Sequence, residues 1–88
     1  MKEAKIVPVI MPDIGEGIVD ATVSYWCYEE GDFVTLGVDL VEMATDKATF
    51  SIPASATGIL REVFFEEGEE IRVGQTIAHI ELLEEESK

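Results

Sequence analysis

The amino-acid sequence predicts an all-β sandwich or barrel, and three observations carry this prediction. Apolar residues alternate with polar ones over short runs, and no window shows the 3.6-residue period of an amphipathic helix. Seven glycines divide the chain into short segments, as tight turns between strands require. A block of the sequence also occurs twice, which indicates two similar halves.

The predicted strands follow one another along the chain. Val7, Val9 and Met11 alternate with other residues before Pro12. The next strand covers residues 22–28 and places Trp26 in the core. Two strand-like runs in residues 40–53 then surround a polar pair and predict a β-hairpin.

The repeat relates the two halves of the chain at a constant spacing. Residues 28–32, Tyr-Glu-Glu-Gly-Asp, return 37 positions later as Phe-Glu-Glu-Gly-Glu in residues 65–69. Acidic turns can recur by chance, but here the apolar positions that follow them also keep register, for example Val34 with Ile71. We therefore expect a pseudo-two-fold axis, with the crossover through residues 44–54 at the end of the molecule opposite the chain ends.

The crossover turn contains Asp46 and Lys47 and no glycine, which predicts a type I turn. The other lysines, at positions 2, 5 and 88, lie near the chain ends. A single lysine at a hairpin tip is what enzymatic attachment of a group to an amine would need. From composition alone, an ordinary solvated turn residue fits Lys47 equally well.

Charge and composition exclude several function classes. The chain has 6 Lys and Arg against 19 Asp and Glu, a net charge of −13, which repels nucleic acid and anionic membranes. One cysteine, Cys27, cannot form an internal disulfide and is expected to be a small buried side chain. With one histidine, His79, no metal site is expected. Pro8 and Glu3 do not suit a targeting peptide, so we expect a cytoplasmic protein.

Two motifs resemble a known family, the lipoyl domain of the acyltransferase component of 2-oxo acid dehydrogenase complexes. They are Asp46-Lys47-Ala48 at the hairpin and Met-Pro-Asp-Ile-Gly-Glu-Gly in residues 11–17. Gly31 and Gly58 also stand where the family has glycines on either side of its modified lysine. The resemblance covers residues 6–82, so we expect a lipoyl domain in residues 1–82 and an acidic tail or linker in residues 83–88.

The resemblance implies a fold and a chemistry. The fold is a flattened barrel of two four-stranded antiparallel sheets with the lysine on a hairpin tip far from the termini. Lys47 would be N6-lipoyllysine, a swinging arm attached by a lipoyl-protein ligase or lipoyltransferase. A thiamine-diphosphate-dependent 2-oxo acid decarboxylase would reductively acylate the arm, an acyltransferase core would pass the acyl group to coenzyme A, and dihydrolipoamide dehydrogenase would reoxidise the dithiol.

The domain itself would be a monomeric, non-catalytic carrier within a longer acyltransferase. Recognition roles are expected for residues beside the lysine, in the preceding loop and at the two family glycines: Asp46, Ala48, Asp13, Glu16, Gly31 and Gly58. Asp46 is expected to fix the turn. Moving Lys47 by one position is expected to abolish modification.

Two alternatives remain at this point. A biotinyl carrier domain shares the fold, but its lysine lies between two methionines, whereas Asp46 and Ala48 flank Lys47 here. An unmodified lipoyl-like module with a structural role would have no need for Asp-Lys-Ala at its tip.

Overall fold

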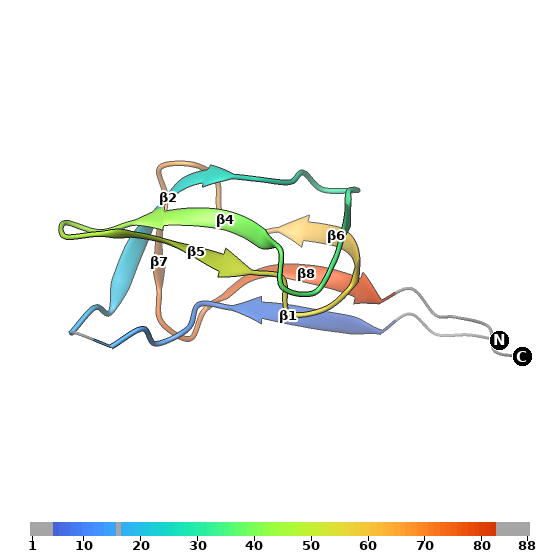
Figure 1. Cartoon of the computed structure of the whole chain (residues 1–88), viewed down its shortest axis with the longest axis horizontal. Coiled ribbons are helices and arrows are strands. Elements are labelled where there is room, and N and C mark those ends of the chain that lie inside the picture. Colours follow the sequence, from blue (N-terminus) through green and yellow to red (C-terminus); the bar gives the residue numbers. More distant parts are fainter. Residues whose placement is uncertain (1–4, 16, 83–88) are drawn as a thin grey trace, which may run out of the picture.

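Eight short strands form two four-stranded sheets in this computed structural model, which describes residues 5–15 and 17–82 (Figure 1). Sheet A has the order β1-β8-β6-β3 and sheet B the order β5-β4-β2-β7, and all neighbouring strands are antiparallel. This confirms the predicted all-β fold. The strands are β1 (Ile6–Ile10), β2 (Asp20–Trp26), β3 (Phe33–Val34), β4 (Asp39–Ala44), β5 (Thr49–Pro53), β6 (Gly58–Val63), β7 (Glu70–Arg72) and β8 (Thr76–Leu82).

The core is built from the inward side chains of the central strands. Leu40 and Met43 on β4 and Ile77 and Ile80 on β8 are fully buried. Burying one such side chain contributes about 1.5–3 kcal/mol relative to leaving it in water. The other buried apolar residues are Val9, Met11, Ala21, Val23, Val34, Val41, Ile52, Ala54, Leu60, Ile71 and Ala78.

The two sheets repeat one design, as the sequence repeat predicts. Each has a repeat-related strand in the same place: β8 in sheet A occupies the position of β4 in sheet B, and β6 that of β2. The irregularities repeat as well. The β2–β4 register shifts between Val23 and Tyr25, and the β6–β8 register shifts between Leu60 and Glu62, at positions that the 37-residue spacing relates. Such bulges bend and twist the strands equally in both halves.

The acidic turns are also equivalent. The Glu29 N–H donates to Asp32 Oδ2 at 2.9 Å in the first half, and in the second the Glu66 N–H donates to Glu69 Oε1 at 2.8 Å. Both turns contain a glycine with positive φ, which explains why glycine recurs in the repeat.

Trp26 and Cys27 lie on opposite sides of the chain at the end of β2. Trp26 packs against the core, partly buried, and its indole N–H donates to the Phe65 carbonyl at 2.9 Å. The expectation of a buried Cys27 is wrong, because strand alternation turns it outward when Trp26 faces inward.

The hairpin of β4 and β5 extends away from the end where β1 begins and β8 ends (Figure 1). At that opposite end, the Leu82 N–H donates to the Lys5 carbonyl at 2.9 Å. The predicted tail in residues 83–88 lies outside the described residues. No helix in the described part of the chain is long and apolar enough to cross a membrane.

Candidate functional site

Lys47 lies in the four-residue loop that joins β4 to β5. The ladder between these strands continues to the pair Ala44 and Thr49, so the loop is held directly on the end of a regular hairpin. The Thr45 N–H donates to the Ala48 carbonyl at 2.8 Å across the base of the loop. Lys47 itself is exposed. The hairpin therefore displays an amine at the end of the molecule far from Lys5 and Leu82.

Thr45 organises this loop. Its hydroxyl oxygen accepts the N–H of Lys47 at 3.2 Å and the N–H of Ala48 at 3.1 Å, and the hydroxyl also lies 3.1 Å from the Ala48 carbonyl, to which it can donate. A threonine hydroxyl that caps the following N–H groups is a known turn-forming device. We expected Asp46 to have this role, and the hydrogen bonds assign it to Thr45. The hydroxyl residue just before the Asp-Lys pair was the signal for it in the sequence.

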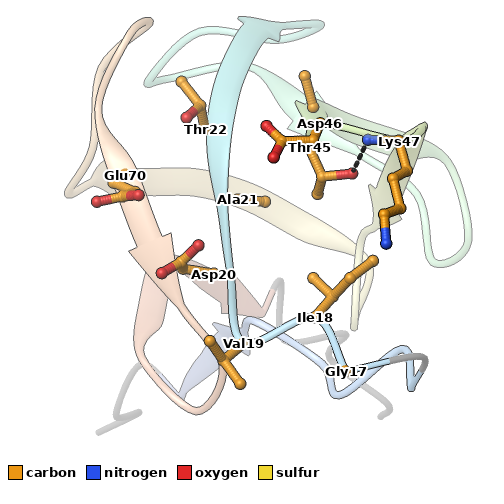
Figure 2. Close-up of a pocket in the computed structure, with 11 residues that line it drawn as sticks. Gly17, Ile18, Val19, Asp20, Ala21, Thr22, Thr45, Asp46, Lys47 and Glu70 are labelled. Carbon is orange, nitrogen blue, oxygen red and sulfur yellow. Dashed lines mark hydrogen bonds between the residues drawn. The ribbon is translucent and has the colours of Figure 1, made fainter.

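A groove of about 480 Å³ lies beside Lys47 (Figure 2). The segment before and within β2 forms one wall, and the end of β4 with its loop forms the other. The side chain of Lys47 extends on the side of Ile18, and Asp20 and Glu70 lie on the other side of the β2 ribbon from it (Figure 2). The lining residues are Gly17, Ile18, Val19, Asp20, Ala21, Thr22, Ala44, Thr45, Asp46, Lys47 and Glu70.

Charge and apolar surface are both present in this groove. Among the described residues that line it, Asp20, Asp46 and Glu70 are acidic and Lys47 is basic. Val19, in the loop just before β2, is 66% exposed. Ile18 and Val19 were not predicted to line a groove, because the local sequence pattern does not show which apolar residues of a loop face water.

The predicted recognition loop reaches the groove only in part. Gly17 and Ile18 line it, whereas Asp13 does not. Instead, Asp13 Oδ1 accepts the Gly15 N–H at 2.9 Å and shapes the loop locally. Glu16 lies outside the described residues.

The two family glycines do not line the groove, and each meets a backbone requirement. Gly31 has φ +97° in the turn after β2, and its N–H donates to the Leu60 carbonyl at 2.7 Å. Gly58 lies on β6 against β8, where a Cβ would overlap the Glu81 carbonyl oxygen. Backbone conformation at Gly31 and close packing at Gly58 therefore each require glycine.

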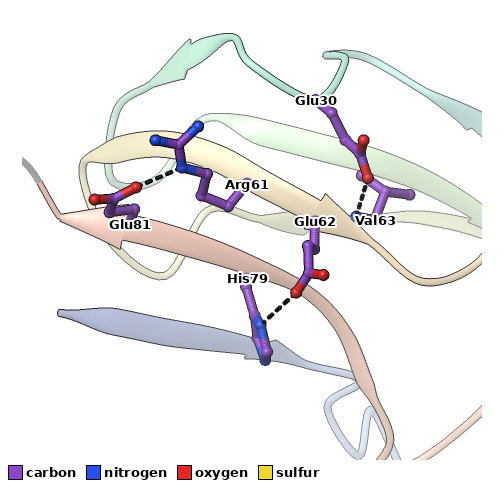
Figure 3. Close-up of polar contacts among 6 residues, drawn as sticks. All are labelled: Glu30, Arg61, Glu62, Val63, His79 and Glu81. Atoms are coloured by element: carbon purple, nitrogen blue, oxygen red, sulfur yellow. Dashed lines mark hydrogen bonds and ion pairs between the residues drawn. The ribbon is translucent and has the colours of Figure 1, made fainter. Parts of the chain in front are cut away.

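Polar contacts join strands of sheet A to one another and to the turn after β2 (Figure 3). His79 Nδ1 lies 3.2 Å from Glu62 Oε1, and Arg61 pairs with Glu81. Glu30 Oε2 accepts the Val63 N–H at 2.8 Å. An ion pair at the surface such as Arg61–Glu81 contributes about 0–1 kcal/mol. His79 thus lies on the surface of sheet A. It is far from the hairpin loop in the sequence and does not line the groove.

Comparison with known proteins gives one consistent family. The sequence model of the biotin/lipoyl family, described as "Biotin-requiring enzyme", matches residues 7–80. The chain is 38% identical over 71 residues to the lipoamide acyltransferase component of the branched-chain alpha-keto acid dehydrogenase complex of Bacillus subtilis, covering 81% of this chain and 17% of that protein. It is 40% identical over 73 residues to the dihydrolipoyllysine-residue acetyltransferase component of the pyruvate dehydrogenase complex of Mycobacterium bovis, covering 83% of this chain and 13% of that protein.

A solved structure agrees with these relatives. The lipoyl domain from the dihydrolipoyl succinyltransferase component of the 2-oxoglutarate dehydrogenase complex of Escherichia coli superposes with a TM-score of 0.70 at 36% identity, covering 91% of this chain and 100% of that one. The chain thus spans less than a fifth of the length of the two relatives but the whole of a separately solved domain. It belongs to the biotin/lipoyl family, as a lipoyl domain of the kind found in the acyltransferase components of 2-oxo acid dehydrogenase complexes.

Proposed function

We propose that this chain is a lipoyl carrier domain in which lipoate is joined through an amide to Nζ of Lys47. The observation that carries the proposal is the position of Lys47, exposed in a hydrogen-bonded loop at the tip of the β4–β5 hairpin. An amine in that place is accessible to a modifying enzyme on the outside of the molecule. The residues fit the group, since the loop leaves the amine uncovered and the neighbours Asp46 and Ala48 are short and exposed.

The part of this chain in the chemistry is to position and present the group. When attached, lipoate supplies a dithiolane that takes up an acyl group with two electrons and gives the acyl group to a thiol. The hairpin holds the attachment point, and the tether replaces affinity with local concentration, so that weak contacts with each enzyme suffice. The domain needs no catalytic groups of its own for this role.

The proposed partners are those that the resemblance to lipoyl domains implies, and the relatives named as acyltransferase components of such complexes support them. A 2-oxo acid decarboxylase would load the domain, an acyltransferase core would unload it to coenzyme A, and dihydrolipoamide dehydrogenase would restore the disulfide. The relatives come from branched-chain, pyruvate and 2-oxoglutarate complexes at similar identity, so the proposal names the substrate class, a 2-oxo acid. We assign recognition by these enzymes to Asp46 and Ala48 and to the loop with Asp13 and Glu16.

Intact-mass measurement tests the proposal. The domain and a Lys47→Arg variant are incubated with lipoate, ATP and a lipoyl-protein ligase, and the products are mapped by peptide mass. We expect an increment of one lipoyl group on the peptide that contains Lys47 and none on the variant.

Other results would contradict the proposal. An increment with biotin and a biotin ligase, and none with lipoate, would make the chain a biotinyl carrier. No increment with either ligase would leave the hairpin without a modification and favour a structural module.

A further inference from the structure

The outer face of sheet A carries a row of large apolar side chains at the end where β1 begins and β8 ends. Glu81 on β8 pairs with both Ile6 and Ile59, and Ile59 pairs with Phe33, so these residues cross all four strands in one line. Leu60, which follows Ile59, is fully buried, and strand alternation therefore directs the row outward. Ile6 is 46% exposed and Phe33 is 52% exposed.

Sheet B serves as an internal control for this row. The pseudo-two-fold relation places Thr49, Ala44, Thr22 and Glu70 at the equivalent positions, and they pair with one another in the same way. Threonine and glutamate at these positions are therefore compatible with the strand geometry, and the fold does not require isoleucine and phenylalanine there. Contiguous apolar side chains on an outer face that folding leaves exposed indicate a contact surface.

The face has a projection at one edge and a hollow toward the other. Phe33 lies on β3, at the edge of the sheet opposite to β1. The hollow has a volume of about 300 Å³, and Figure 3 shows its four polar side chains on β6 and β8. The described residues that line it are Ile6, Arg61, Glu62, His79 and Glu81.

This shape is complementary to a second copy of itself. A two-fold axis that runs along the strands, between two facing copies of sheet A, places β3 of each copy over β1 of the other, so each Phe33 meets the hollow of the opposite copy. Charge favours the same occupant. One arginine and two glutamates give the lining of the hollow a formal charge of −1, against −13 for the whole chain. A second copy is therefore repelled least at this face, whereas a basic protein is attracted to the acidic remainder.

We propose that the outer face of sheet A is a self-association surface through which two copies of this domain form a weak, two-fold symmetric dimer. Four strands about 4.8 Å apart provide a face of a few hundred Å², below the roughly 800 Å² per partner of a stable interface. The dimer is therefore populated only at effective concentrations on the order of millimolar, which linked modules reach, and the dilute domain stays monomeric. Lys47 lies on the hairpin of sheet B and stays uncovered in both copies.

Sedimentation equilibrium of the unmodified domain tests the proposal between about 0.02 mM and about 2 mM protein. In about 200 mM NaCl we expect the average mass to rise with concentration above the 9.7 kDa of the monomer. In about 10 mM NaCl the rise should be smaller, because the charge of the two copies is screened less. Amide chemical shifts that change with concentration should map to Ile6, Phe33 and Ile59. A monomer mass at every concentration would overturn the dimer and leave the face to a different protein, and shift changes confined to sheet B would overturn the assignment.

Matched variants separate the row from the effect of added charge. Phe33→Glu gives sheet A the residue type that sheet B has at the equivalent position, and Val19→Glu adds the same charge in the loop before β2, at a residue of similar exposure. The dissociation constant should rise at least about tenfold in Phe33→Glu and change less than about twofold in Val19→Glu. Equal association of these two variants would refute the assignment.

A variant without a charge change provides a second test. Ile6→Thr copies the equivalent residue of sheet B and should also weaken association, with circular dichroism to verify the fold. The lipoylation of Lys47 by a ligase should be equal in Ile6→Thr, Phe33→Glu and the natural sequence, because the row lies on the other sheet. Failure of this proposal and failure of the proposed function are therefore seen separately. Undiminished association of Ile6→Thr and Phe33→Glu would show that the row is not the contact.

Discussion

At the residue scale, one hydroxyl decides how Lys47 is presented. Thr45 accepts two consecutive backbone N–H groups and so defines the path of the loop through Lys47 and Ala48. Lysine side chains are flexible, but the Cα of Lys47 is held by these bonds, and a modifying enzyme meets the amine at a reproducible place. The hydrogen bonds that shape the turn are made by Thr45, whereas Asp46 is exposed beside Lys47.

Replacing Thr45 tests this role. Thr45→Val keeps the shape of the side chain and removes the acceptor, so we expect a loss of about 0.5–1.5 kcal/mol in the free energy of unfolding, as for one or two partly exposed hydrogen bonds. Thr45→Ser keeps the hydroxyl and serves as the control. Chemical denaturation gives the stability and intact mass gives the lipoylation rate. Equal lipoylation rates for the valine and serine variants would show that the loop needs no such capping.

A second residue-scale prediction concerns the outer face of sheet B. The negative charge of Glu42 and a hydrogen bond to it raise the pKa of Tyr25 above its usual value. Protonated Tyr25 is therefore favoured in the folded state. Its contribution to the stability of the fold is lost as the pH rises through the raised pKa. Glu42→Gln should lower the pKa of Tyr25, which absorbance at 295 nm follows, with Tyr25→Phe to assign the transition. An unchanged titration in Glu42→Gln would refute the interaction.

At the element scale, the close approach of β6 to β8 sets the demand for Gly58. A Cβ at this position meets the backbone of Glu81, and backbone in a central strand pair has little freedom to move. Gly58→Ala should therefore cost about 3 kcal/mol or more of unfolding free energy, at the upper end of the range for overpacking. Ser51→Ala, an exposed change on β5, should stay within about 0.5 kcal/mol. Similar midpoints of denaturation for the two variants would contradict the close approach.

The sequence predicted the elements better than their contacts. The hairpin around Lys47 and the two equivalent halves could be predicted, because alternation, glycine turns and the repeat are local or periodic signals. The groove could not be predicted, since it depends on how the segment before β2 meets the end of β4 in three dimensions. The outward direction of Cys27 was missed for a similar reason, because it depends on which neighbour faces the core.

The predicted recognition residues show the same limit. Asp46 and Ala48 flank Lys47 in the sequence and therefore also in the loop. Gly31 and Gly58 were selected by spacing from Lys47, and the structure explains their identity by a positive φ and by a strand contact. Spacing along a chain does not tell whether a glycine serves a site or the backbone.

At the scale of the whole molecule, charge opposes compactness. A net charge of −13 on 88 residues causes electrostatic repulsion within the folded state, which lowers its stability. The midpoint of thermal unfolding should therefore rise when NaCl increases from about 10 mM to about 200 mM, as the screening length falls from about 30 Å to below 8 Å. A Glu29→Lys/Glu67→Lys variant, with a net charge of −9, should show a smaller rise. A midpoint that falls with salt would mean that attractive ion pairs dominate.

The pseudo-two-fold arrangement gives the molecule two different ends. One end carries the hairpin loop with Lys47, and the other holds Lys5 against Leu82 (Figure 1). A carrier needs this separation, because the attachment point must enter a partner while the rest of the domain stays outside. The central claim is therefore that the position of the lysine on the hairpin, and not the mere presence of an exposed lysine, makes it a lipoylation site.

The most direct measurement moves the amine by one residue. In the variant Asp46→Lys/Lys47→Ala the loop keeps Thr45 and one exposed lysine, and circular dichroism verifies the fold. We predict a lipoyl increment by intact mass for the natural sequence and none for the variant under the same ligase treatment. Lipoylation of the variant at a comparable rate would contradict the account.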